Sequence, residues 1–162
     1  MTDRFRLEQL MALRERRERL AEAALVAQQR RCRDEAHRID ELDLTLAREQ
    51  SDFDRLEQAW FEAAEGTTLS PAELEQARQA IEDHQCRQAE LADACALAKR
   101  ERCRLLEECA RQAEVWRQRS HAREALGRLV ERRRGDVRIV QEGRLEADLE
   151  DTFPRGGSEW RS

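Results

Sequence analysis

The chain has 162 residues, of which 40% are charged and only 4% aromatic, and its formal net charge is −5. It contains 6 Gly, 2 Pro and no Tyr. So few helix breakers and so little apolar material exclude a thick globular core and predict long helices that each bury a stripe. Intrinsic disorder is the alternative for so polar a chain, but the apolar residues are periodic and strong helix formers dominate.

The first predicted element is a helix over residues 3–65. Its second half fits the heptad frame of a left-handed coiled coil. Toward the N-terminus, polar residues occupy frame positions, and a second apolar stripe is displaced from the frame by one residue. We therefore expect the buried face there to shift around the helix, as in a straighter, less supercoiled helix. The frame positions are Leu7, Met11, Arg14, Glu18, Ala21, Leu25, Gln28, Cys32, Glu35, Ile39, Leu42, Leu46, Glu49, Phe53, Leu56, Trp60 and Ala63.

Residues 66–70 form the predicted turn. Gly66 can adopt the left-handed conformation that ends a helix. Ser70 is a natural N-cap, Pro71 suits the first helical position, and Glu73 stands where a capping box needs a carboxylate. These signals predict that the chain reverses here and starts a second helix.

The second predicted helix covers residues 71–150. Its apolar frame positions are Leu74, Ala77, Ile81, Leu91, Cys95, Ala98, Leu105, Cys109, Trp116, Leu126, Val130, Val137 and Val140. Polar residues interrupt the frame at His84, Gln88, Arg102, Gln112, Arg119, Arg123 and Arg133. So many polar positions predict a seam that is only moderately stable alone and that is built to meet a third partner.

The end of the second helix is predicted to fray. Gly127, Gly135 and Gly143 each weaken it by roughly 1 kcal/mol relative to Ala. We expect the helix to stop near Glu150 and residues 151–162 to form a disordered tail, in which Trp160 is either a docking anchor or unstructured.

Together these elements predict an all-α fold, a long two-helix antiparallel coiled-coil hairpin with a disordered C-terminal tail. Arms of about 60 residues would span roughly 90 Å at 1.5 Å per residue. The reversal would place Met11 near Leu126 and Ile39 near Ala98. On the exposed faces, acidic and Arg residues four apart favour ion pairs. These pairs are Glu15–Arg19, Asp34–Arg38, Glu107–Arg111 and Glu124–Arg128.

Charge is unevenly distributed along the chain. Residues 49–93 carry 12 acidic residues against 3 Arg, whereas residues 1–33 carry 9 Arg against 5 acidic residues and residues 111–138 carry 9 Arg against 4. In a hairpin the two basic segments lie side by side at the open end, which would then seek an acidic partner; an unevenly charged but solvated surface is the alternative. The candidate partner-binding residues are Arg14, Arg16, Arg17, Arg19, Arg132, Arg133 and Arg134.

Several function classes are disfavoured. The sequence has no phosphate loop, nucleophile elbow or dinucleotide fingerprint, and a two-helix rod offers no concave interior, so we expect no enzyme and no cofactor. The five Cys form no Cys-x-x-Cys pair or zinc-finger spacing and are read as small buried apolar residues, so we expect no metal. A net negative chain without interleaved aromatics also argues against nucleic acid.

We expect a cytoplasmic protein without direct membrane insertion. No apolar run approaches the roughly 20 residues that a membrane span needs. The opening residues 1–6 lack the apolar core of a signal peptide.

The chain resembles the YscO/HrpO group of type III secretion proteins, which are related to the flagellar export protein FliJ. The resemblance covers residues 1–150 and is carried by the length, the hairpin layout and the Arg-, Leu-, Ala- and Gln-rich opening, residues 5–14. It implies a non-enzymatic central stalk, similar to the coiled coil of a rotary-ATPase gamma subunit. The open end would bind the hexameric secretion ATPase, and the body would contact the export gate and secretion chaperones at the inner membrane.

A generic cytosolic coiled-coil scaffold or tether is the alternative function. A parallel homodimer would bring two segments with a net charge of −9 together, residues 49–93 of each copy. This repulsion favours an intramolecular hairpin, and hence a monomer.

Overall fold

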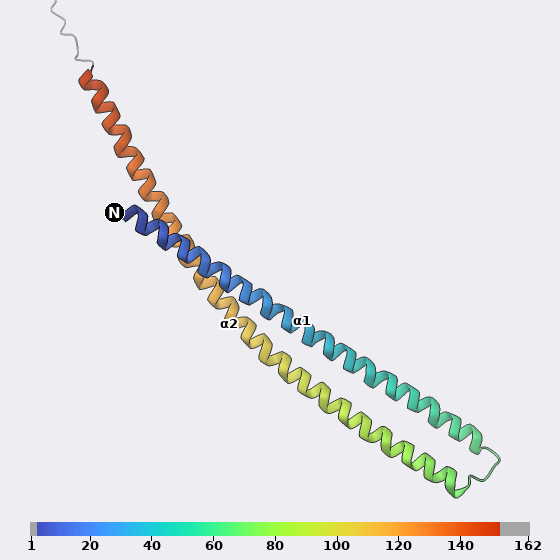
Figure 1. Cartoon of the computed structure of the whole chain (residues 1–162). Coiled ribbons are helices and arrows are strands. Elements are labelled where there is room, and N and C mark those ends of the chain that lie inside the picture. The colour runs from blue at the N-terminus through green and yellow to red at the C-terminus, as the bar shows by residue number, and fades with distance from the viewer. Residues whose placement is uncertain (1–2, 153–162) are drawn as a thin grey trace, which may run out of the picture. The chain divides into compact units, whose positions relative to one another are not determined.

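The computed structural model describes residues 3–152 and contains two long helices packed against each other (Figure 1). Helix α1 spans Asp3–Ala64 and helix α2 spans Pro71–Thr152. No strand occurs between residues 3 and 152. The predicted all-α helical hairpin is therefore confirmed.

The turn between the helices has the predicted local geometry. Gly66 has a φ of 84°, the left-handed conformation that side chains with a Cβ rarely adopt. The Ser70 amide donates to Oε2 of Glu73 at 2.8 Å, and the Glu73 amide donates to Oγ of Ser70 at 3.2 Å. This reciprocal capping box satisfies two amide groups that the first turn of α2 leaves without helical partners.

The end of α2 differs slightly from the prediction. Helix α2 continues through Gly127, Gly135 and Gly143 and ends at Thr152, so residues 151 and 152, which we assigned to the tail, are helical. A hydroxyl–carbonyl hydrogen bond from Thr152 to Asp148 closes this last turn. The rest of the predicted tail, with Trp160, lies outside the described residues.

The chain divides into two compact units. Unit 1 comprises, among the described residues, 3–21 of α1 and 115–152 of α2. Unit 2 comprises residues 22–114, which include the turn.

Unit 2 has a narrow apolar core on the predicted frame. Ile39, Cys95 and Ala98 form its central cluster, with Leu42 and Leu46 packed against it. The predicted neighbourhood of Ile39 and Ala98 is therefore confirmed. The other buried side chains of this unit are Gln28, Cys32, Leu91 and Leu105.

The part of unit 2 next to the turn is more open than the frame predicted. Four expected core residues are exposed there: Leu56, Ala63, Leu74 and Ile81. The seam is instead filled by His84, whose ring stacks on Phe53 at a centroid distance of 3.9 Å, and by Trp60, which meets Phe53 edge-on at 6.1 Å. The sequence analysis treated His84 as a polar interruption of the frame. Its flat aromatic ring instead packs in the seam, where an aliphatic side chain was expected.

Unit 1 is joined mainly by polar contacts between its two helices. Nη1 of Arg14 donates to the carbonyl of Ala122 at 2.7 Å, and Arg123 forms an ion pair with Glu18. The buried apolar residues of this unit are Ala21 and Leu126. A Cβ placed on Gly127 would lie 3.5 Å from Cε of Met11, which confirms the expected closeness of Met11 to this turn of α2.

The apolar seam of unit 1 ends earlier than predicted. Val137 and Val140, which we placed on the seam, are 49% and 53% exposed. Helix α1 begins at Asp3, and its carboxylate reaches Arg133 at 3.6 Å. Val137 therefore borders only the first turns of α1, beside Leu7, and beyond that level α2 has no facing helix among the described residues to cover Val140.

Frame drift and short ion pairs account for the remaining differences. Arg102 and Arg119 are exposed while Glu101 and Ser120 are half-buried, a shift of one residue typical of a straighter helix.

Of the predicted ion pairs between residues four apart, Glu124–Arg128 forms, at 3.8 Å. Three-residue pairs replace two others, with Arg38 on Glu35 and Arg111 on Glu108, and the Glu15–Arg19 pair does not form.

Candidate partner-binding surface

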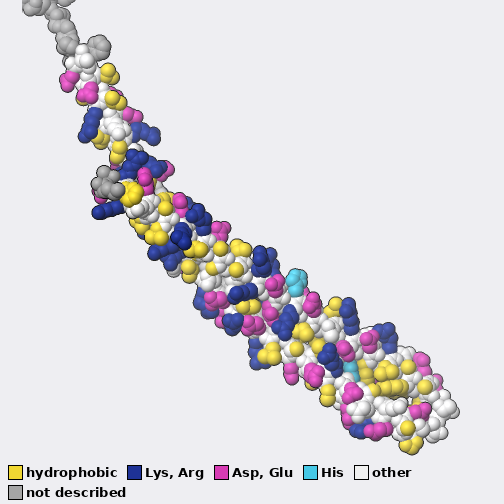
Figure 2. Space-filling view, in the orientation of Figure 1, with side chains coloured by type: hydrophobic (Ala, Val, Ile, Leu, Met, Phe, Trp, Pro, Cys, Tyr) yellow, Lys and Arg dark blue, Asp and Glu magenta, His cyan; other side chains and the backbone are white. Residues whose placement is uncertain are grey.

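Unit 1 concentrates basic side chains on its two helices. Residues 115–138 hold 8 Arg against 3 acidic residues, and residues 3–21 hold 6 Arg against 4. On the face seen in Figure 2, dark blue guanidinium groups gather around the N-terminal part of α1 and the part of α2 beside it. Since all these cations are Arg, they carry fixed forks of donors suited to carboxylates.

The Arg cluster of α1 is mostly free. Arg16, Arg17 and Arg19 are exposed, and none pairs with another side chain between residues 3 and 152. Arg14 differs, because it is half-buried and its guanidinium is engaged by the carbonyl of Ala122. Of the four predicted residues in α1, three therefore face solvent and one joins the helices of unit 1.

The Arg cluster of α2 has a similar division. Arg133 pairs with Asp3 at 3.6 Å, with both side chains more than half exposed. Arg132 and Arg134 are exposed and have no ion-pair partner in the part of the chain that the structure describes. Within the described part of the chain, the predicted residues whose guanidinium groups are free are Arg16, Arg17, Arg19, Arg132 and Arg134.

A groove in unit 1 lies beside the α2 cluster and measures about 670 Å³. Leu7, Val130 and Val137 provide its apolar side chains. Its polar lining residues are Asp3, Arg4, Glu8, Arg133, Arg134, Arg138 and Gln141. The apolar base is bordered by four Arg and two carboxylates, so the groove is basic overall.

A second groove of unit 1, about 800 Å³, shares Val130 and Arg134 with the first. Arg132 also lines it, together with Met11 from α1. The remaining lining residues are Glu15, Arg123, Glu124, Gly127, Arg128 and Glu131. The two grooves join the α2 cluster to the apolar side chains between the helices, which gives a partner both contact area and charge.

Sequence reasoning missed these grooves. Leu7 and Val130 were read as closed core positions, and Arg138 was not singled out. The signal was present in part: a seam rich in Arg cannot close completely, because guanidinium groups must reach water or a carbonyl. The location of the grooves depends on how α1 pairs with α2, which residue order alone did not fix.

Unit 2 offers a hollow of opposite charge, about 640 Å³ in volume. Its lining residues are Asp54, Glu57, Gln58, Phe61, Glu62 and Glu65. Phe61 is 67% exposed among these carboxylates. The surface beside the turn accordingly shows apolar and acidic side chains with few basic ones (Figure 2).

Neither unit presents a cluster of metal-ligating side chains within the described residues. Between residues 3 and 152, no three His, Cys, Asp or Glu side chains cluster as metal ligands would. The shifted carboxyl pKa values belong to surface pairs: Arg78 lowers the pKa of Glu75, Arg104 that of Glu101, and Arg111 that of Glu108. Neither α1 nor α2, as described, contains a stretch apolar and long enough to span a bilayer.

Comparison with known proteins gave no relatives: no family model, curated protein or solved structure matches this chain.

Proposed function

We propose that this protein is a non-enzymatic central stalk of a type III secretion apparatus, of the YscO/HrpO and FliJ-like kind that its sequence resembles. The basic surface of unit 1 binds the hexameric secretion ATPase. Other parts of the hairpin contact the export gate and secretion chaperones. The protein acts as a monomer in the cytoplasm, at the inner-membrane apparatus, and binds no nucleic acid.

The observation that carries this proposal is the set of free guanidinium groups in unit 1. Arg16, Arg17 and Arg19 on α1 and Arg132 and Arg134 on α2 are exposed, and none of them has an ion-pair partner between residues 3 and 152. In unit 2, Arg55, Arg78 and Arg104 are held by carboxylates three or four residues away. The exposed Arg30, Arg31 and Arg33 of unit 2 line none of the grooves described above, whereas Arg132 and Arg134 do. Unpaired Arg beside an apolar groove favours an acidic protein surface as partner.

The proposed contact has a defined physical character. Guanidinium groups at the rim steer an acidic partner and set the rate of association, which falls as salt screens the charges. The apolar side chains of the two grooves add affinity through burial. Binding should therefore weaken with ionic strength without being abolished.

The test is ATP hydrolysis by the secretion ATPase encoded beside this gene, measured with and without the purified protein. The test variant is Arg16→Ala, Arg17→Ala, Arg19→Ala. A matched control, Arg30→Ala, Arg31→Ala, Arg33→Ala, removes the same charge from exposed positions of unit 2. Arg14 is left intact because it joins the two helices.

We expect the wild-type protein and the control to stimulate hydrolysis and co-elute with the ATPase. The test variant, at unchanged helicity, should bind at least about tenfold more weakly, since each lost charge-assisted contact is worth roughly 1 kcal/mol or more. Equal binding of test variant and control would remove the assignment to unit 1. Absence of both stimulation and co-elution would return the protein to the class of generic coiled-coil scaffolds.

A further inference from the structure

Two cysteines of unit 2 lie on facing helices. Cys32 belongs to α1 and is buried, and Cys109 belongs to α2 and is half-buried. Both occupy frame positions of the coiled-coil seam, so both side chains are directed toward the partner helix. Cys86 and Cys103, in contrast, are exposed.

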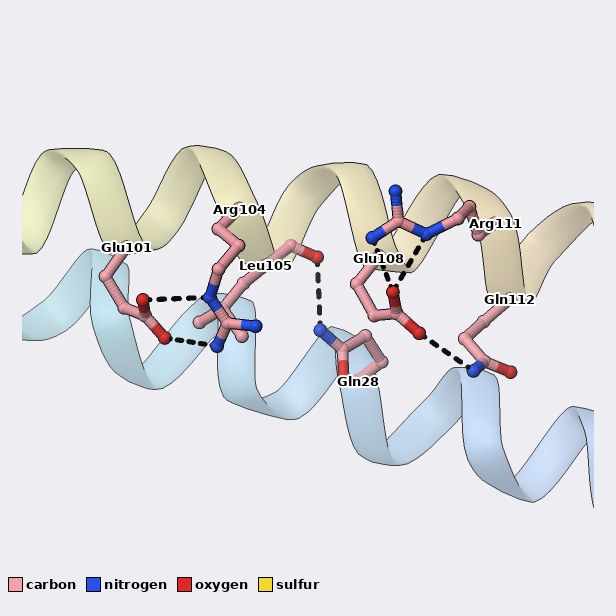
Figure 3. A network of polar contacts seen from close by, with 7 residues as sticks. All are labelled: Gln28, Glu101, Arg104, Leu105, Glu108, Arg111 and Gln112. Carbon is pink, nitrogen blue, oxygen red and sulfur yellow. Dashed lines mark hydrogen bonds and ion pairs between the residues drawn. The ribbon is translucent and has the colours of Figure 1, made fainter.

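The register of the seam places these two cysteines one turn apart on facing helices. Nε2 of Gln28 on α1 donates to the carbonyl of Leu105 on α2 at 3.1 Å (Figure 3). The packing of Ile39 with Ala98 sets the register: one heptad before Ile39 and one heptad after Ala98, Cys32 lies opposite Leu105. Because the helices run antiparallel, Cys109 lies opposite Gln28, and the Gln28–Leu105 hydrogen bond crosses the same one-turn offset as the two thiols. Side chains tilt toward the N-terminus of their own helix, so in an antiparallel pair the two thiols lean toward each other from opposite directions.

The surroundings of the thiols agree with this placement. Burial raises the pKa of the Cys32 thiol, and the neighbouring Cys109 thiol raises it further, whereas Arg102 acts in the opposite direction. The third buried cysteine, Cys95, faces a carboxylate instead, with its Sγ 3.3 Å from Oδ1 of Asp43. Among the cysteines, Cys32 and Cys109 thus share one location, and Cys95 has a different partner.

We propose that Cys32 and Cys109 are a modification site, at which a small-molecule disulfide such as oxidised glutathione forms a reversible disulfide between α1 and α2 within unit 2. The thiolate of Cys109, the more accessible of the pair, attacks one sulfur of the oxidant and releases one glutathione thiolate. Cys32 then gives its proton to water and attacks the Cys109 sulfur, releasing the second glutathione. Two cysteine thiols are oxidised and one oxidant disulfide is reduced to two thiols.

The bond would tie together residues far apart in sequence. A disulfide that closes a loop this long stabilises mainly by constraining the unfolded chain. Because unit 2 has a narrow core, the bond would resist separation of α1 from α2. Reduction would restore the starting state, which makes the change reversible.

The test uses the full chain with Cys86→Ser and Cys103→Ser, so that the exposed thiols cannot link molecules. The protein is incubated with oxidised glutathione under native conditions, its free thiols are alkylated, and it is analysed by intact mass and peptide mapping. We expect an intact mass two hydrogens below that of the chain alkylated at Cys95 alone, a linked peptide containing Cys32 and Cys109, and a thermal midpoint higher by roughly 5–15 °C. Added dithiothreitol should reverse all three changes.

Two further variants in the same background sharpen the test. Cys109→Ser, checked by circular dichroism, should give neither the linked peptide nor the shift in midpoint. Cys95→Ser should leave the linked peptide unchanged. Only mixed glutathione adducts, or links from Cys32 to Cys95, would overturn the proposal.

Discussion

Unit 2 and unit 1 use the same heptad frame but fill it with different side chains. In unit 2 the frame is occupied by Ile39, Cys95 and Ala98, which form a closed cluster. In unit 1 several frame positions carry charge, and contacts such as Arg14 with Ala122 and Arg123 with Glu18 join the helices. One repeat thus builds a mostly apolar seam and a mostly polar one within the same helix pair.

This difference between an apolar and a polar seam shows how a thin hairpin can combine stability with a binding surface. Apolar burial in unit 2 is insensitive to salt, whereas polar contacts across unit 1 are weaker and partly screened. A seam that does not close completely leaves apolar groups such as Leu7 and Val130 accessible in a groove. Unit 2 therefore supplies most of the stability and unit 1 supplies the surface.

The largest expected effect comes from the apolar seam of unit 2. Leu105 is only 7% exposed, so Leu105→Ala should lower the free energy of unfolding by about 3 kcal/mol through lost burial and the cavity left behind. Leu149 of unit 1 is 60% exposed, so Leu149→Ala should change it by less than about 0.5 kcal/mol. Urea unfolding followed by circular dichroism measures both, and equal losses would contradict the comparison.

A smaller effect is expected from the polar seam of unit 1. The ion pair of Glu18 and Arg123 is only 16% and 34% exposed. A double-mutant cycle with Glu18→Gln and Arg123→Gln should give a coupling of about 1 kcal/mol at low salt, reduced at high salt. A coupling near zero at low salt would show that this contact does not stabilise unit 1.

Glycine replacement should strengthen the seam of unit 1 modestly. A Cβ on Gly127 would make an ordinary contact with Met11 at 3.5 Å, so Gly127→Ala should stabilise the protein by about 0.5–1 kcal/mol. Gly66→Ala in the turn should destabilise it instead, because Gly66 has a φ of 84°. Chemical denaturation distinguishes the two signs, and a loss of stability in Gly127→Ala would mean that unit 1 cannot accept the added methyl group.

The smallest effect concerns the surface ion pairs of unit 2. The hydrogen bond from Arg104 lowers the pKa of Glu101 below its usual value of 4.5. This pair thus stabilises the fold above about pH 4.5, and the stabilisation is lost as pH falls through the lowered pKa. Arg104→Gln should therefore lower the thermal midpoint at neutral pH, only slightly because water screens the exposed pair. This difference should shrink as pH falls through the lowered pKa of Glu101, because protonation removes the carboxylate. A difference that grows at low pH would contradict this reading.

Local sequence signals predicted the framework of the fold. The capping residues Ser70 and Glu73 located the start of α2, and the periodic apolar residues identified most buried positions, including Leu91 and Leu126. These features depend on neighbours within a few residues, so a single sequence contains them. The type III secretion function has not been tested by the fold and stays a proposal.

Features that depend on pairing between the helices were less predictable. Leu74 and Ile81 fit the frame but are exposed, because stacking of His84 on Phe53 fills the seam near the turn. Val137 is half exposed because only the first turns of α1 lie beside it, where the seam opens into a groove. The candidate Arg residues were identifiable by charge alone, but their division into free and engaged groups required the partner helix.

The most direct test of the account is hydrogen exchange of the full chain, measured by mass spectrometry with and without the secretion ATPase. We predict slower exchange in the peptides of unit 1 that contain residues 14–19 and 132–134, with little change near the turn of unit 2. Protection confined to residues 54–65, or none in unit 1, would contradict the assignment of the binding surface.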